Sequence, residues 1–215
     1  MLNPHPMPCV RSISTARRLW ATLACLVLVT GCSTGGTHPP APREIPGSDY
    51  AYKIGPLDTV NVIVWRNPDL SMIVPVRPDG KISTPLVPDV LALNKTPAQL
   101  QSEMEAALSK FIRDPVVTVI VTNFVGPASE QIRVIGEAAK PQILPFRSKM
   151  TVLDVMIAVG GLTDFADGNA ATIFRVSEGG KLYSVRLRDL VRRGDIGANV
   201  DMAPGDILVI PQGYF

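Results

Sequence analysis

Cysteine and histidine are scarce in this sequence. Its 215 residues include three cysteines, Cys9, Cys25 and Cys32, and two histidines, His5 and His38. All three cysteines lie near the start of the chain, and His38 lies among prolines. A Cys/His metal site is therefore excluded, and so is any catalytic triad that uses histidine as its base. We expect no catalytic residue, no metal and no cofactor.

Long hydrophobic runs are also missing. The longest begins at Leu19 and ends at Val29, which is about half of the roughly 20 apolar residues that a membrane-spanning helix requires. Three arginines and no acidic residue precede it. A basic region, a short apolar region and small residues at its end are typical of a secretory signal peptide. We therefore expect residues 1–31 to target the chain without anchoring it.

The stretch Leu28–Cys32 closes this run and has a glycine directly before Cys32. It resembles the lipobox of bacterial lipoproteins, in which the leader is removed and the new N-terminal cysteine is lipidated. The alternative is an ordinary leader with an incidental cysteine. With Cys9 and Cys25 lost in the leader, no disulfide could form. Ser33 stands where an aspartate would favour the inner membrane, so the resemblance implies a chain anchored to the outer membrane through Cys32 and facing the periplasm.

An overall positive charge is missing as well. The formal net charge of +2 is misleading, because three of the 21 basic residues and none of the 19 acidic residues lie in residues 1–31, which leaves 18 against 19. Such a chain has no basic field with which to hold nucleic acid by its phosphates. No nucleic-acid partner is expected.

The remaining residues predict a linker and an α+β domain. Residues 32–48 are rich in Gly, Pro, Ser and Thr, so we expect a flexible linker. Residues 49–125 predict strands at 58–65, 70–76, 81–86 and 116–122 with one helix before the last of them. Apolar residues occupy both faces of the first strand, which predicts burial on both sides. Pro75 places the second strand at an edge or at its end.

The helix of this domain has clear boundary signals. Thr96 is the expected N-cap, with a proline at the first helical position and Gln99 completing a capping-box pattern. Its apolar stripe is predicted to be Leu100, Met104, Ala107, Leu108 and Phe111.

A second domain is predicted at residues 126–215, after the turn residues Gly126–Ser129. Strands are expected at 131–135 and 140–146, followed by a helix that is capped by Thr151 and ended by Gly160 and Gly161. Two further strands, at 171–176 and 182–187, a short helix at 188–193 and a last strand at 207–210 complete the prediction. This order is that of a β-grasp domain, a sheet wrapped on one helix.

Several motifs carry a resemblance to known proteins. In the first domain they are Tyr52–Asp58, Val76–Ile82 and Asp114–Val119. In the second domain they are Val134–Glu137 and Gly160–Ala166. The first set resembles the outer-membrane polysaccharide export family, lipoproteins of capsule and exopolysaccharide secretion, and the second resembles the soluble-ligand-binding β-grasp (SLBB) module. The resemblance implies a polysaccharide export N-terminal domain at 49–125 and an SLBB domain at 126–215.

The resemblance implies a non-enzymatic part of an exopolysaccharide export translocon, a homo-oligomeric ring that conducts the polymer or couples it to an outer-membrane partner. Exopolysaccharide and an inner-membrane polysaccharide co-polymerase that regulates chain length are the implied partners. Larger members end in an amphipathic pore helix, whereas this sequence stops at Phe215 after the last predicted strand. It most resembles short members linked to exosortase-type clusters, so no C-terminal transmembrane helix and a separate outer-membrane β-barrel partner are expected.

Two other functions stay open. The chain could be a periplasmic lipoprotein that binds glycan or peptidoglycan without conducting it. It could also be a polysaccharide-modifying enzyme, which the lack of usable histidine and cysteine disfavours.

Some polar and aromatic residues allow two interpretations. Asp58, Asp79 and Asp206 are either acid/base carboxylates or turn residues, and we favour turns because each follows Gly or Pro closely. Trp65 and Phe165 either stack on sugars or are buried, and burial is favoured.

Basic residues gather near the end of the chain: Lys181, Arg186, Arg188, Arg192 and Arg193. They could line a passage for an anionic polysaccharide. A solvated surface with Asp189 and Asp195 interspersed is the favoured interpretation, since mixed charge is the usual state of a protein surface.

Overall fold

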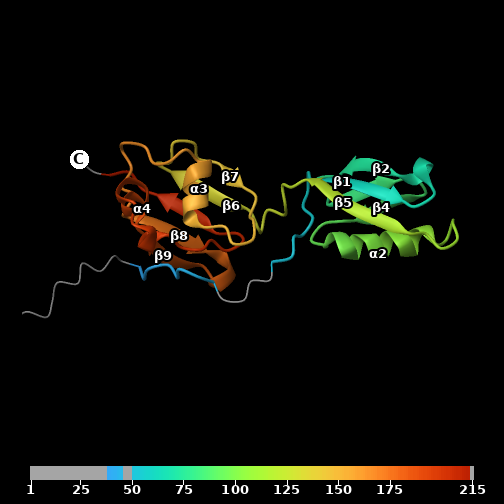
Figure 1. Cartoon of the computed structure of the whole chain (residues 1–215), viewed down its shortest axis with the longest axis horizontal. Helices are drawn as coiled ribbons and strands as arrows, with labels where there is room; N and C mark the ends of the chain where they lie inside the picture. Colours follow the sequence, from blue (N-terminus) through green and yellow to red (C-terminus); the bar gives the residue numbers. More distant parts are fainter. Residues whose placement is uncertain (1–37, 46–49, 214–215) are drawn as a thin grey trace, which may run out of the picture. The chain divides into compact units, whose positions relative to one another are not determined.

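The structure is a computed structural model that describes residues 38–45 and 50–213. These residues build two hydrophobic cores with separate sets of helices and strands (Figure 1). In the described part of the chain, no helix has the length and apolar character needed to cross a membrane. Cys32 lies outside the described residues.

The first domain is α+β, as predicted. Its elements are β1 (Thr59–Val64), β2 (Met72–Pro75), β3 (Lys81–Thr84), β4 (Val87–Leu91), α2 (Pro97–Leu108) and β5 (Val117–Asn123). A short 3-10 helix, η2 (Pro68–Leu70), joins β1 to β2. An antiparallel sheet has the order β2-β1-β5, and β3 pairs with β4 in a separate hairpin. β2 is an edge strand that ends at Pro75, as predicted.

Helix α2 forms where its capping signals predict it. The Thr96 hydroxyl accepts from the Gln99 backbone N–H, and the Gln99 side chain accepts from the Thr96 N–H. Leu100, Met104 and Leu108 are buried in the core that also contains the valines of β1 and β5. Phe111 lies beyond the end of α2 and is exposed, so its placement in the apolar stripe is wrong.

Strand β1 is buried on one face only. Val60, Val62 and Val64 point into the core, whereas Ile63 and Trp65 are exposed. The expectation that both faces are buried is therefore wrong. The physical reason is that α2 packs on one face of the sheet (Figure 1), and in the described chain no element packs on the other.

Strand β4 was not expected from the sequence. It contains Pro88, which cannot donate a hydrogen bond to a neighbouring strand, and Asp89, which has a left-handed φ of 60°. Both residues are exposed. β4 tolerates them because it belongs to a two-stranded hairpin and has a free edge.

The second domain is a β-grasp fold, as predicted. Its elements are β6 (Ile132–Gly136), β7 (Ile143–Leu144), α3 (Val152–Ala158), β8 (Ala171–Arg175), β9 (Lys181–Val185), α4 (Leu187–Arg193) and β10 (Ile207–Ile210), with 3-10 helices η3 (Val176–Glu178) and η4 (Ile196–Ala198). The sheet order is β7-β6-β10-β8-β9. β10 runs parallel to β6 and antiparallel to β8.

Two local features fix this fold. Thr151 and Asp154 form a capping box at the start of α3, which buries Val152, Val155 and Met156. At the end of β6, Gly136 has a φ of 90°, and a Cβ there would lie 2.0 Å from the Ile210 carbonyl oxygen. Only glycine allows the two strands to approach so closely.

Residues 39–41 pair with the edge strand β9. The Ser184 N–H donates to the Pro39 carbonyl over 2.8 Å, and the Ala41 N–H donates to the Ser184 carbonyl over 3.2 Å. Ala41 is buried in the second core. The expectation of a flexible linker does not hold for these residues, because an edge strand offers unpaired backbone groups that any chain segment can satisfy.

Candidate functional site

Asp58 is fully buried and its carboxylate accepts four hydrogen bonds. Oδ2 accepts from the Gly55 N–H at 2.8 Å and from the Tyr52 hydroxyl at 2.5 Å. Oδ1 accepts from the N–H groups of Val125 and Gly126 at 2.7 and 2.9 Å. Burial, followed by the hydrogen bond to Asp58, raises the pKa of Tyr52 well above its ordinary value. This carboxylate fastens the turn before β1 to the segment after β5.

Asp206 occupies the same position in a second turn. Its Oδ2 accepts from the N–H of Ala203, three residues earlier, at 2.8 Å, as Asp58 accepts from Gly55. The third residue of both turns has a left-handed φ, 68° at Leu57 and 82° at Gly205. Gly55–Asp58 and Ala203–Asp206 thus form the same kind of turn, and a strand, β1 or β10, follows each of them directly.

The remaining acceptor capacity of Asp206 is taken by a buried arginine. Arg175, on β8, is 1% exposed and Asp206 is 0% exposed. The Arg175 Nη2 and Nε atoms lie 3.0 and 3.2 Å from Asp206 Oδ2, and Nη2 also donates to the Asp201 carbonyl at 3.0 Å. Burial raises the pKa of Asp206, and the hydrogen bonds from Arg175 act in the opposite direction.

Asp79 belongs to a third, exposed turn. It accepts a bidentate ion pair from Arg77, which also contacts Asp89 at 2.6 Å. The hydrogen bonds from Arg77 lower the pKa of Asp79. Asp58, Asp79 and Asp206 thus each accept a hydrogen bond from the backbone of their own turn, as predicted. Asp58 and Asp206 also bind partners elsewhere in their domains.

The basic residues near the end of the chain are paired with neighbours. Lys181 pairs with Glu178, and Arg186 pairs with both Asp189 and Asp195. Arg188 donates to the Ala166 carbonyl. Arg192 pairs with Asp164, and Arg193 pairs with Asp189. All five therefore have a hydrogen-bond acceptor within the second domain. These contacts support the favoured interpretation, a surface of mixed charge.

Trp65 and Phe165 are both exposed, by 65% and 58%. The favoured interpretation, burial, is wrong for both. Trp65 follows β1 on the face of the sheet opposite the core, and Phe165 lies in the connection between α3 and β8. The alternation of apolar residues in a strand does not tell which face a helix will cover.

The two motifs of the second domain pack against each other. The Thr163 hydroxyl donates to Glu137 Oε2 at 2.6 Å, the Thr163 N–H donates to the Glu137 carbonyl at 3.1 Å, and the Ala139 N–H donates to the Gly161 carbonyl at 3.0 Å. Gly160 and Gly161, which have φ of 78° and 90°, end the helical segment, as predicted. The motifs thus connect the end of β6 to the end of α3.

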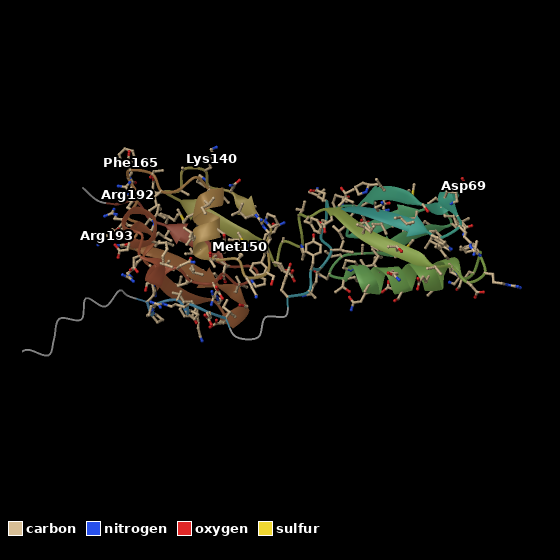
Figure 2. All side chains as sticks on the ribbon, viewed as in Figure 1. Asp69, Lys140, Met150, Phe165, Arg192 and Arg193 are labelled. Carbon is tan, nitrogen blue, oxygen red and sulfur yellow. The ribbon has the colours of Figure 1, made fainter. Side chains whose placement is uncertain are left out.

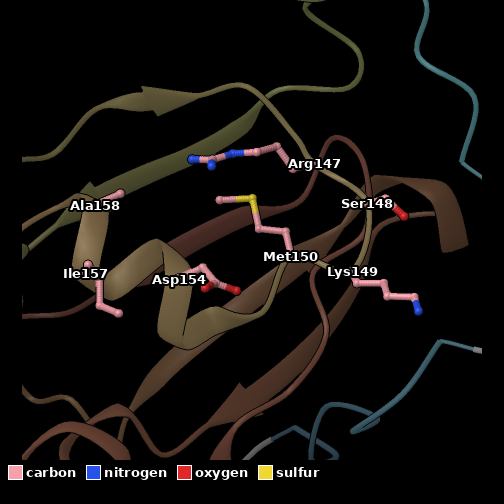
Figure 3. A pocket seen from close by; sticks show the side chains of 7 residues that line it. All are labelled: Arg147, Ser148, Lys149, Met150, Asp154, Ile157 and Ala158. Atoms are coloured by element: carbon pink, nitrogen blue, oxygen red, sulfur yellow. The ribbon is translucent and has the colours of Figure 1, made fainter.

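A pocket of about 510 Å³ lies beside α3, within the usual size range of small-molecule sites. Its lining is Arg147, Ser148, Lys149, Met150, Asp154, Ile157 and Ala158. In Figure 3 the Arg147 side chain extends over Met150, with Asp154 and Ile157 projecting from the helix. No sequence motif indicated this site, because its residues come from a loop and a helix with no distinctive spacing.

Both polar and apolar side chains line the pocket. Lys149 has a left-handed φ of 59°, and such backbone strain is often found at binding sites. The Asp154 carboxylate already has hydrogen-bond donors, because its Oδ2 accepts from the Thr151 N–H at 2.8 Å and from the Thr151 hydroxyl at 2.7 Å. Arg147, Lys149 and Ser148 can donate to a hydroxyl-rich or anionic ligand. Among the described residues, no three His, Cys, Asp or Glu side chains could together hold a metal ion.

Stability of the second domain should depend on pH through Asp154. The hydrogen bonds from Thr151 lower the pKa of Asp154, so its contribution is complete above the unfolded-state pKa and is lost as the pH falls through the folded-state pKa. Asp154→Ala should lower the free energy of unfolding by about 0.5 to 1 kcal/mol at neutral pH, and the difference from wild type should shrink below pH 4. Urea titrations at both pH values measure it.

Asp164→Ala provides the control for that prediction. The Asp164 side chain is almost fully exposed and pairs with Arg192. Its removal should leave stability nearly unchanged at both pH values. If Asp164→Ala and Asp154→Ala behaved alike, the capping box would not be the source of the pH dependence.

Comparison with known proteins adds two family matches. Residues 46–122 match the family described as polysaccharide biosynthesis/export protein, and residues 130–210 match the SLBB domain. The chain is also similar to the EPS I polysaccharide export outer membrane protein EpsA. It is 23% identical over 185 residues to EpsA of Ralstonia nicotianae (strain ATCC BAA-1114 / GMI1000) and 25% identical over 181 residues to EpsA of Ralstonia solanacearum.

These alignments cover 75% and 73% of this chain but 47% of each relative. The chain thus spans about half the length of the curated relatives it matches.

Proposed function

Since the chain belongs to a polysaccharide export family with an SLBB domain, we propose that it is a component of an exopolysaccharide export translocon at the outer membrane. The observation that carries this proposal is the order of the two domains, an export domain followed by a β-grasp domain, in a chain similar to proteins named for polysaccharide export. In the described residues the carboxylates considered for catalysis all accept hydrogen bonds or ion pairs from structural partners within their own domains. This supports a role in which the protein moves or holds polymer without altering it.

We further propose that the protein is a homo-oligomeric ring, with domains at 49–125 and 126–215. It would receive polymer from an inner-membrane co-polymerase and pass it to an outer-membrane partner. Native mass spectrometry of the detergent-purified protein tests the ring. A closed oligomer of one size is expected, and a strictly monomeric protein in both detergent and lipid would argue against it.

Lipidation of Cys32 is the proposed means of attachment to the outer membrane. Cys32→Ser should leave the protein uncleaved or free of the outer membrane, because stable anchoring needs at least two acyl chains and a lipidated cysteine would supply them. Membrane fractionation and intact-mass measurement would detect the change. Ser33→Ala is the matched control and should be processed and anchored as the wild type. Equal outer-membrane association of Cys32→Ser and wild type would contradict the anchor.

Deletion of the gene tests the proposed function as a whole. Cells without the protein should show no exopolysaccharide on their surface while they continue to make its lipid-linked precursor. Complementation with the wild-type chain should restore the surface polymer.

A second candidate function is glycan or peptidoglycan binding without conduction. The pocket lined by Arg147 and Lys149 favours it, because it offers hydrogen-bond donors and apolar side chains around a volume that fits a small ligand. Normal secretion in the deletion strain, together with retention of cell-wall fragments on the purified protein, would identify this function instead.

A further inference from the structure

The sheet of the first domain has one face that no described element covers. Cross-strand pairing places Ile73, Asn61 and Ile120 in one row across β2, β1 and β5, and Ile63 beside Thr118 in the next. The Trp65 N–H donates to the Val116 carbonyl at 2.9 Å, which extends the pairing beyond the ends of the strands. We call this surface the open face.

The open face has no charged residue. By alternation with the buried valines, its members are Thr59, Asn61, Ile63, Trp65, Ile73, Pro75, Val116, Thr118, Ile120 and Thr122. Large apolar side chains on it are well exposed, with Trp65 at 65% and Ile73 at 63%. The largest exposed apolar patch of a soluble protein is often a functional surface.

Trp65 is held at one end of this face by a network of hydrogen bonds. The Asn67 side chain donates to the Trp65 carbonyl at 3.0 Å. The Ser71 hydroxyl accepts from the Val64 N–H at 2.9 Å and donates to the Asn67 carbonyl at 3.1 Å. Arg66 has a left-handed φ of 62°, a strained conformation for this residue. Figure 2 labels Asp69 in the same turn. The turn thus fixes the backbone of Trp65, an exposed residue that is not part of the core of the domain.

The size of the open face indicates what it contacts. Three strands about 4.8 Å apart, with a rise of about 3.4 Å per residue, give a footprint of roughly 14 by 20 Å, or about 300 Å². A stable protein–protein interface needs about 800 Å² from each partner. The open face is therefore small for a second copy of the chain and has the proportions of a narrow, linear ligand.

We propose that the open face binds a strand of polysaccharide, with Trp65 stacked on one sugar ring. The face of a pyranose ring presents C–H groups, which pack against an indole and against isoleucine side chains. Its rim presents hydroxyls, which Asn61 and Thr118 can hydrogen-bond. A surface without charge neither repels nor traps a charged polymer, which suits weak contact with a polymer in transit. This inference rests on the proposed function and assigns it a contact surface.

Fluorescence of Trp65 tests the inference directly. The sequence has two tryptophans. Trp20 lies in the expected leader, so Trp65 is the only one in the processed protein, and Trp20→Phe gives the same result for any chain that keeps its leader. The probe is oligosaccharide prepared by mild acid hydrolysis of exopolysaccharide from the culture medium of the producing cells. We expect saturable binding, and we expect the acrylamide quenching constant of Trp65 to fall by about half, because one face of the ring becomes covered.

Two matched substitutions separate the open face from the rest of the surface. Ile120→Asp, within the face, should weaken binding about tenfold. Ile196→Asp changes an exposed isoleucine of the second domain that lies outside the pocket beside α3, and it should leave the affinity unchanged. Thermal unfolding of both variants shows whether the fold is kept, and Thr118→Ala offers a milder change in the face that should weaken binding at least twofold.

Three results would overturn the inference. They are quenching of Trp65 that the oligosaccharide does not alter, equal affinity of the variants within the face and the wild type, and shielding of Trp65 by raised protein concentration alone. The last would identify a second copy as the occupant. Normal export in the deletion strain would instead defeat the proposed function, whatever Trp65 reports. If export requires the protein but the oligosaccharide does not shield Trp65, this inference is wrong and the proposed function stands.

Discussion

Replacement of Arg175 by methionine is expected to lower the free energy of unfolding of the second domain by about 3 to 5 kcal/mol. Arg175 donates to Asp206 and to the Asp201 carbonyl from a position that water does not reach. Methionine keeps much of the volume but leaves the Asp206 carboxylate buried without its cation. Hydrogen exchange measured peptide by peptide would report the loss in the second domain separately from the first.

The pH dependence of this loss identifies its cause. In the variant, Asp206 can relieve its burial by taking up a proton, so the loss should be larger at pH 7 than at pH 4. Arg192→Met is the matched control, because its partner Asp164 is solvent-exposed, and it should cost less than about 1 kcal/mol. Equal costs for the two arginines, or a loss independent of pH, would contradict the buried-pair account.

Replacement of Asp58 by alanine should lower the free energy of unfolding of the first domain by at least about 3 kcal/mol. The substitution removes a charged acceptor from the N–H groups of Gly55, Val125 and Gly126 and from the Tyr52 hydroxyl. Hydrogen bonds to charged groups contribute about 1.5 to 3 kcal/mol each, and their buried donors would be left unpaired. Chemical denaturation followed by Trp65 fluorescence in the Trp20→Phe background measures this loss.

Asp79→Ala is the control for Asp58→Ala. Asp79 sits in a turn of the same domain, but its carboxylate is exposed and its partner Arg77 keeps Asp89 as a second acceptor. Water can replace the lost contacts, so the change should be far smaller than at Asp58. A similar loss at both positions would mean that burial and the four hydrogen bonds of Asp58 do not matter.

Local signals in the sequence were sufficient to predict much of the fold. The capping boxes at Thr96 and Thr151 involve residues three positions apart, and both helices begin where these pairs predict. The order of elements in the second domain predicted a β-grasp fold, which the parallel pairing of β10 with β6 completes. Proline and glycine next to Asp58 and Asp206 were enough to predict turns, because aspartate hydrogen-bonds the backbone of its own turn.

Features that depend on distant residues were not predicted. The pairing of residues 39–41 with β9 depends on an edge strand more than a hundred residues later in the sequence, whereas composition alone indicates a free linker. The exposure of Trp65 depends on which face of the sheet α2 covers. The pocket at Arg147 depends on how a loop folds beside α3. None of these is encoded in a short pattern, because each is decided by tertiary packing.

The most direct measurement of the central claim is a pulse and chase of labelled sugar in cells from which this protein is rapidly depleted. The family description joins biosynthesis and export, and this experiment separates the two. If the protein acts in export, labelled polymer should accumulate within the cell envelope soon after depletion, while label continues to enter the lipid-linked precursor at the normal rate. Arrival of labelled polymer in the medium at the undepleted rate, or an immediate fall in precursor labelling, would contradict that role.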